Sequence, residues 1–299
     1  MSQGIATFLK PEALHKLGRL SLQSRYVVEG NLAGRHRSPL IGLGGEFADH
    51  RDYVSGDDPK FIDWKVLGRT DKYYIRRYEN ETNLRVYIIL DRSASMGFGS
   101  TALTKFQYAS YLAVALGYVT IKARDSVGFY AFSDQIDVRM GARNSVGHLN
   151  NIARTLLDLQ PAQTTRTAKT LHMIAESIRR RAMVIVISDL FDEDEEVVNG
   201  LAHFRKNNHD VILLHTLDPQ EVDFNFKQGG EFQDMETGEI VVADPRGMAE
   251  DYRQAFGAFL EKYQRRCVEM RIDYRMVNMR EPPETFVRAY LDERKRLSR

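Results

Sequence analysis

The stretch that decides the fold is LRVYIIL, residues 84–90, which runs directly into DRSASMGFGS, residues 91–100. The first part is a short apolar run rich in residues that favour β-strands, and the second is typical of a loop. A long apolar segment follows at residues 105–123. The pattern predicts a buried strand, a loop and a helix in that order, which is typical of a parallel sheet covered by helices.

The same alternation continues toward the C-terminus. We expect further strands at residues 126–132, 136–140, 183–188, 211–217 and 273–278. We expect helices at residues 11–31, 146–159, 170–180, 195–206, 248–268 and from about 283 to the end, with a hairpin at 228–243. Apolar strands that alternate with helices indicate an α/β protein with a doubly wound, mostly parallel, Rossmann-like sheet.

An amino-terminal segment, residues 1–81, precedes the regular domain expected at residues 82–299. Its most unusual part is GDDPKFIDW, residues 56–64. We interpret this stretch as structural rather than as a binding loop. Asp58 would cap a helix that has the following proline at its first position, and Trp64 would be a buried packing anchor between the segment and the sheet.

The composition is that of an ordinary soluble globular protein. Of the 299 residues, 43% are hydrophobic, and 42 Lys and Arg nearly balance 41 Asp and Glu, for a net charge of +1. This balance excludes wholesale disorder and gives no overall attraction to nucleic acid or an anionic membrane. The single cysteine, Cys267, excludes an intrachain disulfide. The N-terminus lacks the apolar stretch of a signal peptide, and the longest apolar run, residues 111–121, is too short to span a bilayer. We therefore expect a cytoplasmic protein without a transmembrane segment.

Polar side chains follow two of the expected strands at their carboxyl ends. Asp91, Ser93 and Ser95 come directly after the first strand, and Asp189 comes directly after a later one. Between them, PAQTTRT at residues 161–167 supplies hydroxyl groups just before a helix. In such sheets, ligands bind beyond the carboxyl ends of the strands. Two carboxylates and several hydroxyls form an all-oxygen donor set, which predicts a site for a hard divalent cation such as Mg²⁺.

This constellation resembles the metal-ion-dependent adhesion site of von Willebrand factor A domains. The upstream segment also resembles the signature of one bacterial family, at Arg51, Tyr53, Gly56, Asp57, Ile62, Asp63, Trp64 and Arg69. That family, catalogued as domain of unknown function fifty-eight, is typically encoded beside MoxR-type AAA+ ATPases. The resemblance covers roughly residues 45–220 in order, which makes it far more specific than the DxSxS motif alone.

The resemblance implies a von Willebrand factor A-like fold and a ligand for each part of a metal site. Asp91, Ser93 and Ser95 would form the first metal loop, Thr165 the second and Asp189 the third, with Mg²⁺ or Mn²⁺ as the bound ion. The family often has Gly-Gly-Thr where this chain has Gln163, Thr164 and Thr165, so Thr164 or Thr167 is an alternative ligand. Gly68 also stands where the family usually has alanine.

Other interpretations of these residues are weaker. Asp91 and Ser93 would also serve as simple caps of the following helix. A phosphatase of the haloacid dehalogenase type needs a second carboxylate where this chain has Ser93, and the sequence has neither a GxSxG elbow nor a P-loop. The eight histidines show no zinc-ligand spacing, and Cys267 has no paired base.

We therefore expect a non-enzymatic, protein-binding adaptor in which an acidic side chain of a partner completes the coordination of the metal ion. By the family resemblance, that partner would be a MoxR-type AAA+ ATPase or a client that the ATPase remodels. The alternatives are a metal-dependent hydrolase or phosphatase, and a scaffold whose site has lost its metal.

Overall fold

The computed structural model describes most of the 299 residues. The residues outside the description are 1–2, 18–21, 23–45, 55–56, 58, 60–61, 80–83, 163–166, 192–193, 227–229, 234, 236–238, 244 and 298–299. The chain forms two compact units. The sheet unit comprises residues 1–25 and 85–299, and the hairpin unit comprises residues 26–84.

The sheet unit is built on six strands in the order β10, β7, β6, β3, β4, β5. Their bounds are β3 (Arg85–Asp91), β4 (Ser126–Phe132), β5 (Ile136–Arg143), β6 (Met183–Ser188), β7 (Asp210–Leu217) and β10 (Asp273–Asn278). All neighbouring strands are parallel except β5, which runs antiparallel to β4 at one edge. The predicted mostly parallel α/β sheet is confirmed.

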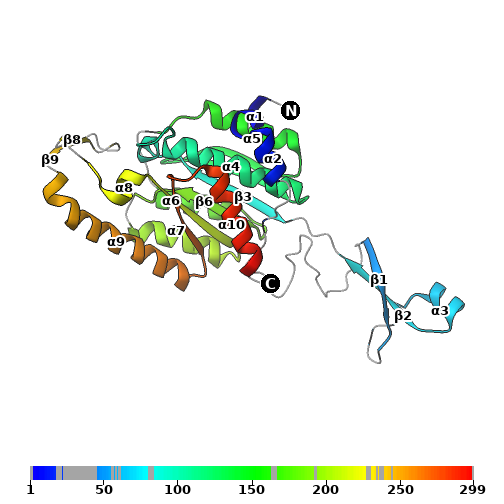
Figure 1. Ribbon diagram of the computed structural model, residues 1–299. Helices are drawn as coiled ribbons and strands as arrows, with labels where there is room; N and C mark the ends of the chain where they lie inside the picture. The colour runs from blue at the N-terminus through cyan, green and yellow to red at the C-terminus, as the bar shows by residue number, and fades with distance from the viewer. Residues whose placement is uncertain are drawn as a thin grey trace. The chain divides into compact units, whose positions relative to one another are not determined.

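The central strands are mainly apolar because both of their faces are covered. Every residue of β6 and β7 is buried. The helices that cover the two faces are α4 (Lys105–Lys122), α5 (Val146–Asp158) and α10 (Pro283–Leu297) on one, and α6 (Thr167–Ser177), α7 (Asp194–Lys206) and α9 (Pro245–Glu269) on the other (Figure 1). This doubly wound arrangement places the loops that follow β3 and β6 next to each other at one edge of the sheet.

Two amino-terminal helices belong to the sheet unit. They are α1 (Gln3–Phe8) and α2 (Pro11–Leu17), and both contact α4. Their apolar side chains, including Ile5 and Leu14, are buried. Both helices fall within the amino-terminal segment expected at residues 1–81, and in the structure they belong to the same unit as residues 85–299. The expected helix at residues 11–31 ends at Leu17 as α2, and most of the remainder lies outside the described residues.

The hairpin unit contains β1 (Glu46–Asp52), which pairs antiparallel with β2 (Tyr74–Glu79), and the helix α3 (Trp64–Thr70) between them. Asp63 caps α3 by accepting hydrogen bonds from the backbone N–H groups of Lys65 and Val66. Helix α3 therefore begins after Asp63, while Pro59 itself lies in a 3₁₀ turn and accepts the N–H of Ile62 at 3.1 Å. The expected cap, Asp58, lies outside the described residues.

Parts of GDDPKFIDW make structural contacts within the hairpin unit. Arg51 makes two hydrogen bonds to the carboxylate of Asp57, at 2.8 and 2.9 Å, and Ile62 is buried. Trp64 is the first residue of α3 and is 59% exposed. Its burial between the amino-terminal segment and the sheet stays a prediction.

The remaining elements are short and connect the larger ones. They are the 3₁₀ helix η2 (Ala94–Gly97), the helix α8 (Pro219–Asp223) and the antiparallel hairpin of β8 (Gly230–Gln233) and β9 (Ile240–Ala243). This hairpin falls within the range predicted for it. Within the described part of the chain, no helix combines the length and the apolar character needed to cross a membrane.

Candidate metal-binding site

The predicted aspartates lie at the ends of two adjacent parallel strands. β3 ends at Asp91, and β6 ends at Ser188, directly before Asp189. The two strands pair in parallel, with Leu90 opposite Ile187, so the next residues of both strands meet at the same edge. The side chains of both aspartates are buried, each with 1% exposure. The structure therefore brings together the two carboxylates that the sequence analysis placed at one edge.

The predicted serines also belong to this edge. The backbone N–H of Ser93 donates to Oδ1 of Asp91 at 2.8 Å. The hydroxyl oxygens of Ser93 and Ser95 lie 2.9 Å apart in a mutual hydrogen bond, with Ser93 buried and Ser95 half-buried. Ser95 lies in η2, whose tight turn keeps the two hydroxyls adjacent. Asp91, Ser93 and Ser95 thus form one compact set of oxygen donors.

Sequence analysis missed a contribution from Ser188. The hydroxyl of Ser188 donates to Oδ2 of Asp91 at 2.6 Å and accepts the backbone N–H of Leu190 at 2.9 Å. Leu190 has a positive φ of 57°, a conformation that costs free energy for a residue other than glycine. The chain therefore turns sharply after Asp189. The hydroxyl of Ser188 bonds to both Asp91 and Leu190 and so joins the end of β6 to the end of β3.

The threonine part of the predicted site is only partly described. Thr164 and Thr165 lie outside the described residues, and Thr167 is buried as the first residue of α6. The segment that leads into this loop is fixed next to the first metal loop. The backbone N–H of Ala162 donates to the carbonyl of Arg92 at 2.6 Å, and Nε of Arg92 donates to the carbonyl of Gln160 at 2.9 Å.

Burial and charge act together on Asp91. Loss of water in the buried site, followed by the negative charge of Asp189, raises the pKa of Asp91 to about 7. The hydrogen bonds from Ser188 and Ser93 oppose this rise without cancelling it. Two buried carboxylates beside each other leave negative charge that a cation would balance.

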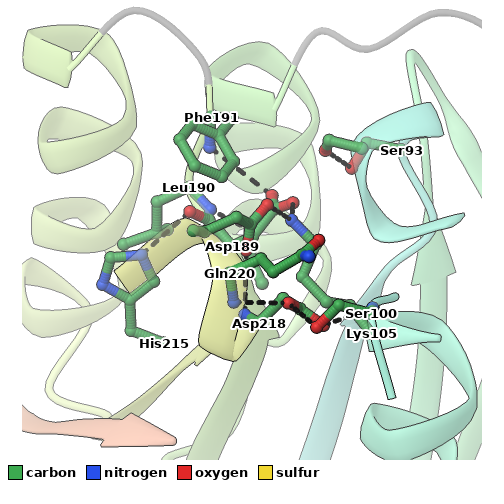
Figure 2. Close-up of polar contacts among 12 residues, drawn as sticks. Ser93, Ser100, Lys105, Asp189, Leu190, Phe191, His215, Asp218 and Gln220 are labelled. Atoms are coloured by element: carbon green, nitrogen blue, oxygen red, sulfur yellow. Dashed lines mark hydrogen bonds and ion pairs between the residues drawn. The ribbon is translucent and has the colours of Figure 1, made fainter. Parts of the chain in front are cut away.

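A buried ammonium group lies on the other side of Asp189. Nζ of Lys105 contacts Oδ2 of Asp189 at 2.7 Å and Oε1 of Glu221 at 2.5 Å, and the Lys105 side chain is 0% exposed (Figure 2). It also lies 4.9 Å from the ring centroid of Phe191. Burial by itself lowers the pKa of Lys105, but the charges of Asp189 and Glu221 raise it more, and the net shift is upward. Lys105 is therefore charged.

Helix α8 positions Glu221 for this contact. Asp218 caps α8 by accepting the N–H of Gln220 at 2.8 Å, and its own N–H donates to Oε2 of Glu221 at 2.8 Å. The carboxylate of Asp218 also accepts the backbone N–H and the hydroxyl of Ser100, at 2.8 and 2.5 Å (Figure 2). This capping box ties the loop after η2 to the carboxyl end of β7.

His215 holds the backbone of Asp189 by a hydrogen bond. Because a carbonyl only accepts hydrogen bonds, Nε2 of His215 donates to the carbonyl of Asp189 at 2.9 Å, and Nδ1 then accepts from the hydroxyl of Tyr274, also at 2.9 Å. The complete burial of His215 lowers its pKa to about 4, so the imidazole is neutral near pH 7. Both ring nitrogens are used structurally.

The donor set has the chemistry of a hard-cation site. Among the described residues, no group of three or more His, Cys, Asp or Glu side chains is arranged to hold a metal ion. A metal at this edge would therefore depend on hydroxyl oxygens beside the two aspartates. Oδ1 of Asp91 accepts the N–H of Ser93 and Oδ2 accepts the hydroxyl of Ser188. A carboxylate offers about four lone-pair sites, so such an acceptor can also bind a cation.

Comparison with solved structures finds similar chains at low sequence identity. BatB from Bacteroides thetaiotaomicron is 15% identical with a TM-score of 0.47, and the match covers 72% of this chain and 100% of BatB. The VWA domain of SpRpn10 is 12% identical with a TM-score of 0.39, covering 69% of this chain and 94% of that domain. The fold of this chain is a mostly parallel six-stranded α/β sheet covered by helices on both faces, with an added amino-terminal segment.

Comparison of the sequence yields relatives and a family. Uncharacterized protein Rv1480 of Mycobacterium tuberculosis and Uncharacterized protein Mb1516 of Mycobacterium bovis are each 26% identical over 255 residues, which cover 83% of this chain and 79% of the relative. Residues 49–266 match the family described as "Protein of unknown function DUF58". This range contains both the GDDPKFIDW stretch and the two strand ends of the candidate site. The chain belongs to the DUF58 family.

Proposed function

We propose that this chain is a non-enzymatic adaptor that binds a protein partner through a divalent cation held at the carboxyl ends of β3 and β6. The observation that carries the proposal is the excess of buried negative charge at this edge. The carboxylates of Asp189 and Glu221 contact the ammonium of Lys105, and the buried carboxylate of Asp91 lies close enough to Asp189 to feel its charge. When all four are ionised, their net charge is two negative units, which one Mg²⁺ or Mn²⁺ would balance.

In this proposal the chain's own oxygens hold the cation. Asp91, Ser93 and Ser95 supply one side, Asp189 the other, and a threonine of the 163–167 segment completes the protein ligands. The bound ion supplies an electropositive point that attracts a carboxylate. A hard cation of this kind keeps positions for water or for an outside oxygen, so a partner's Asp or Glu has a position to occupy.

The absence of a catalytic role is also part of the proposal. Two titratable groups that bond to Asp189 are engaged in structural contacts: Lys105 lies between two carboxylates, and His215 uses both ring nitrogens. Neither is placed to accept a proton from a water molecule. These contacts favour a binding role over hydrolysis.

The identity of the partner is proposed from the family resemblance. Families of this kind are typically encoded beside MoxR-type AAA+ ATPases, so we propose such an ATPase, or a client that it remodels, as the protein that offers the acidic side chain. The balanced net charge of +1 is consistent with recognition of a specific protein surface rather than of nucleic acid.

The first test is metal binding by the purified full chain. We expect calorimetry to detect one Mn²⁺ or Mg²⁺ site, and Asp91→Ala to weaken it at least about tenfold, since changes around metal ligands alone cost that much. Asp292→Ala, an exposed aspartate of α10, is the matched control and should bind as wild type does. Absence of binding at millimolar metal, or equal binding by Asp91→Ala, contradicts the proposal.

The second test separates the adaptor from the hydrolase alternative. An AAA+ ATPase or its client should be retained from lysate by the wild type in the presence of metal, and lost with EDTA or in Asp189→Ala. Metal-dependent turnover of phosphoester or peptide substrates by the pure protein, abolished in Asp91→Ala, would instead establish an enzyme.

A further inference from the structure

We infer that Lys105 is a specificity-determining residue: its charge lowers the affinity of the site for the cation and makes the occupied site accept a carboxylate from outside. The inference rests on the proposed function, because it concerns the same site. It assigns a role to a residue that neither the motif nor the family signature includes.

The position of Lys105 costs free energy unless its positive charge is paired with negative groups. It is the first residue of α4, where the helix macrodipole is positive and opposes a cation. Its side chain is 0% exposed, so the ammonium has also lost its water. What offsets these costs is contact with two carboxylates, Asp189 at 2.7 Å and Glu221 at 2.5 Å, and the ring of Phe191 at 4.9 Å. The ammonium is thus part of the charge balance of the site.

The charge balance gives Lys105 two opposite effects. With Lys105 in place, a bound divalent cation leaves the group of Asp91, Asp189, Glu221 and Lys105 neutral. Without Lys105 the same group would hold the cation more tightly, but the occupied site would keep one negative charge and would repel an incoming carboxylate. Asp218 accepts hydrogen bonds from Ser100 and Gln220. Its charge is the same with and without Lys105, so it does not affect the difference between the two states.

A purely structural role for Lys105 predicts a different outcome. Lys105 joins the start of α4 to the end of β6 and to α8, so its loss would free the carboxylate of Asp189. If orientation of Asp189 were all that mattered, removal of Lys105 would weaken cation binding and carboxylate binding together. The charge role instead requires the two affinities to change in opposite directions.

The experiment compares four full-length proteins: wild type, Lys105→Met, Glu221→Gln and the double variant. Mn²⁺ alone is titrated by calorimetry, and acetate is then titrated into the Mn²⁺-loaded protein while water-proton relaxation is followed. We expect Lys105→Met to bind Mn²⁺ about tenfold or more tightly and acetate correspondingly more weakly. Glu221→Gln should show the opposite pair of changes, and the double variant should return to near wild type in both.

Two controls keep the result interpretable. Lys122→Met removes the same charge from the exposed far end of α4 and should change neither affinity. Circular dichroism checks the folding of each variant, and Glu221→Gln tests the charge role independently if Lys105→Met does not fold. Weaker Mn²⁺ binding in folded Lys105→Met, or no opposite shift in Glu221→Gln, overturns the inference while the site itself stands. Absence of Mn²⁺ binding by the wild type overturns the proposed function as well.

Discussion

Asp91 is the residue at which burial and charge conflict most directly. Its carboxylate is 1% exposed and lies beside that of Asp189, and together these conditions raise its pKa to about 7. A carboxyl group in the unfolded chain has a pKa of about 3.9. The metal-free protein therefore binds a proton at Asp91 under conditions in which the unfolded chain has released it.

This difference makes the stability of the metal-free protein depend on pH. Between about pH 4 and pH 7 the folded state binds more protons at Asp91 than the unfolded state, so the free energy of unfolding falls as pH rises. The steepest contribution is about 1.4 kcal/mol per pH unit. Asp91→Asn cannot titrate and should lack this contribution. Urea unfolding of both proteins in EDTA across this range measures it, and parallel pH profiles would contradict the argument.

At the scale of elements, the contact of α1 with α5 depends on a glycine. The N–H of Gly4 donates to Oδ1 of Asn150 at 3.2 Å, and a Cβ at Gly4 would lie 2.9 Å from that oxygen and 3.0 Å from Cγ of Arg154. The backbones of the two helices therefore approach too closely for a larger side chain. This contact is one of those that attach the amino-terminal helices to the sheet unit.

Gly4→Val should consequently separate α1 from α5. We expect a loss of about 1 to 3 kcal/mol of stability, the usual cost of overpacking. Hydrogen exchange should also become faster in residues 3–17. Gly257→Ala is the matched control, because a Cβ at that position of α9 meets no atom within 4 Å. Equal stability of Gly4→Val and wild type would show that α1 contributes little to the fold.

Most helices and strands were predictable from the sequence, because the residues that indicate an element lie within that element. β4, β6 and β10 have the predicted bounds. For β4 and β6 the reason is that short, largely apolar runs of strand length have few alternatives. The start of α3 was not predictable in this way. Asp58-Pro59 and Asp63 both offer helix-capping chemistry, and only the structure shows that Asp63 caps α3.

The partners within the candidate site were less predictable, for a physical reason. Asp91 and Asp189 follow strands, so strand order alone brings them together. Lys105 and His215 reach Asp189 across 84 and 26 positions of the chain, and Glu221 reaches Lys105 across 116, through the packing of α4, α8 and β7. Neither spacing nor periodicity encodes such contacts. The sequence shows a lysine at the start of the expected helix. That its side chain is buried is visible only in the structure.

At the scale of the whole molecule, the two units differ in the size of their cores. The sheet unit buries long runs of apolar residues, whereas the hairpin unit, in its described part, buries the apolar side chains of Ile62, Ile75 and Leu84. Small cores leave little stability above the entropy cost of folding. The hairpin unit should therefore open more readily than the sheet.

Native-state hydrogen exchange checks this expectation in the full chain. Amides of β1 and β2 should exchange through openings of lower free energy than amides of β6, because β6 is buried along its whole length. Low concentrations of urea should lower the protection of β1 and β2 first. Equal opening free energies for the three strands would instead mean that the chain unfolds as one cooperative unit.

The antiparallel strand β5 has a consequence for self-association. It forms one edge of the sheet, and an edge strand presents backbone groups that can pair with another chain. Arg139 and Arg143 are exposed along β5, alternating with less exposed residues. Like charges brought together by edge-to-edge pairing repel each other, so this strand discourages the growth of continuous sheets between molecules and protects the protein against fibrillar aggregation.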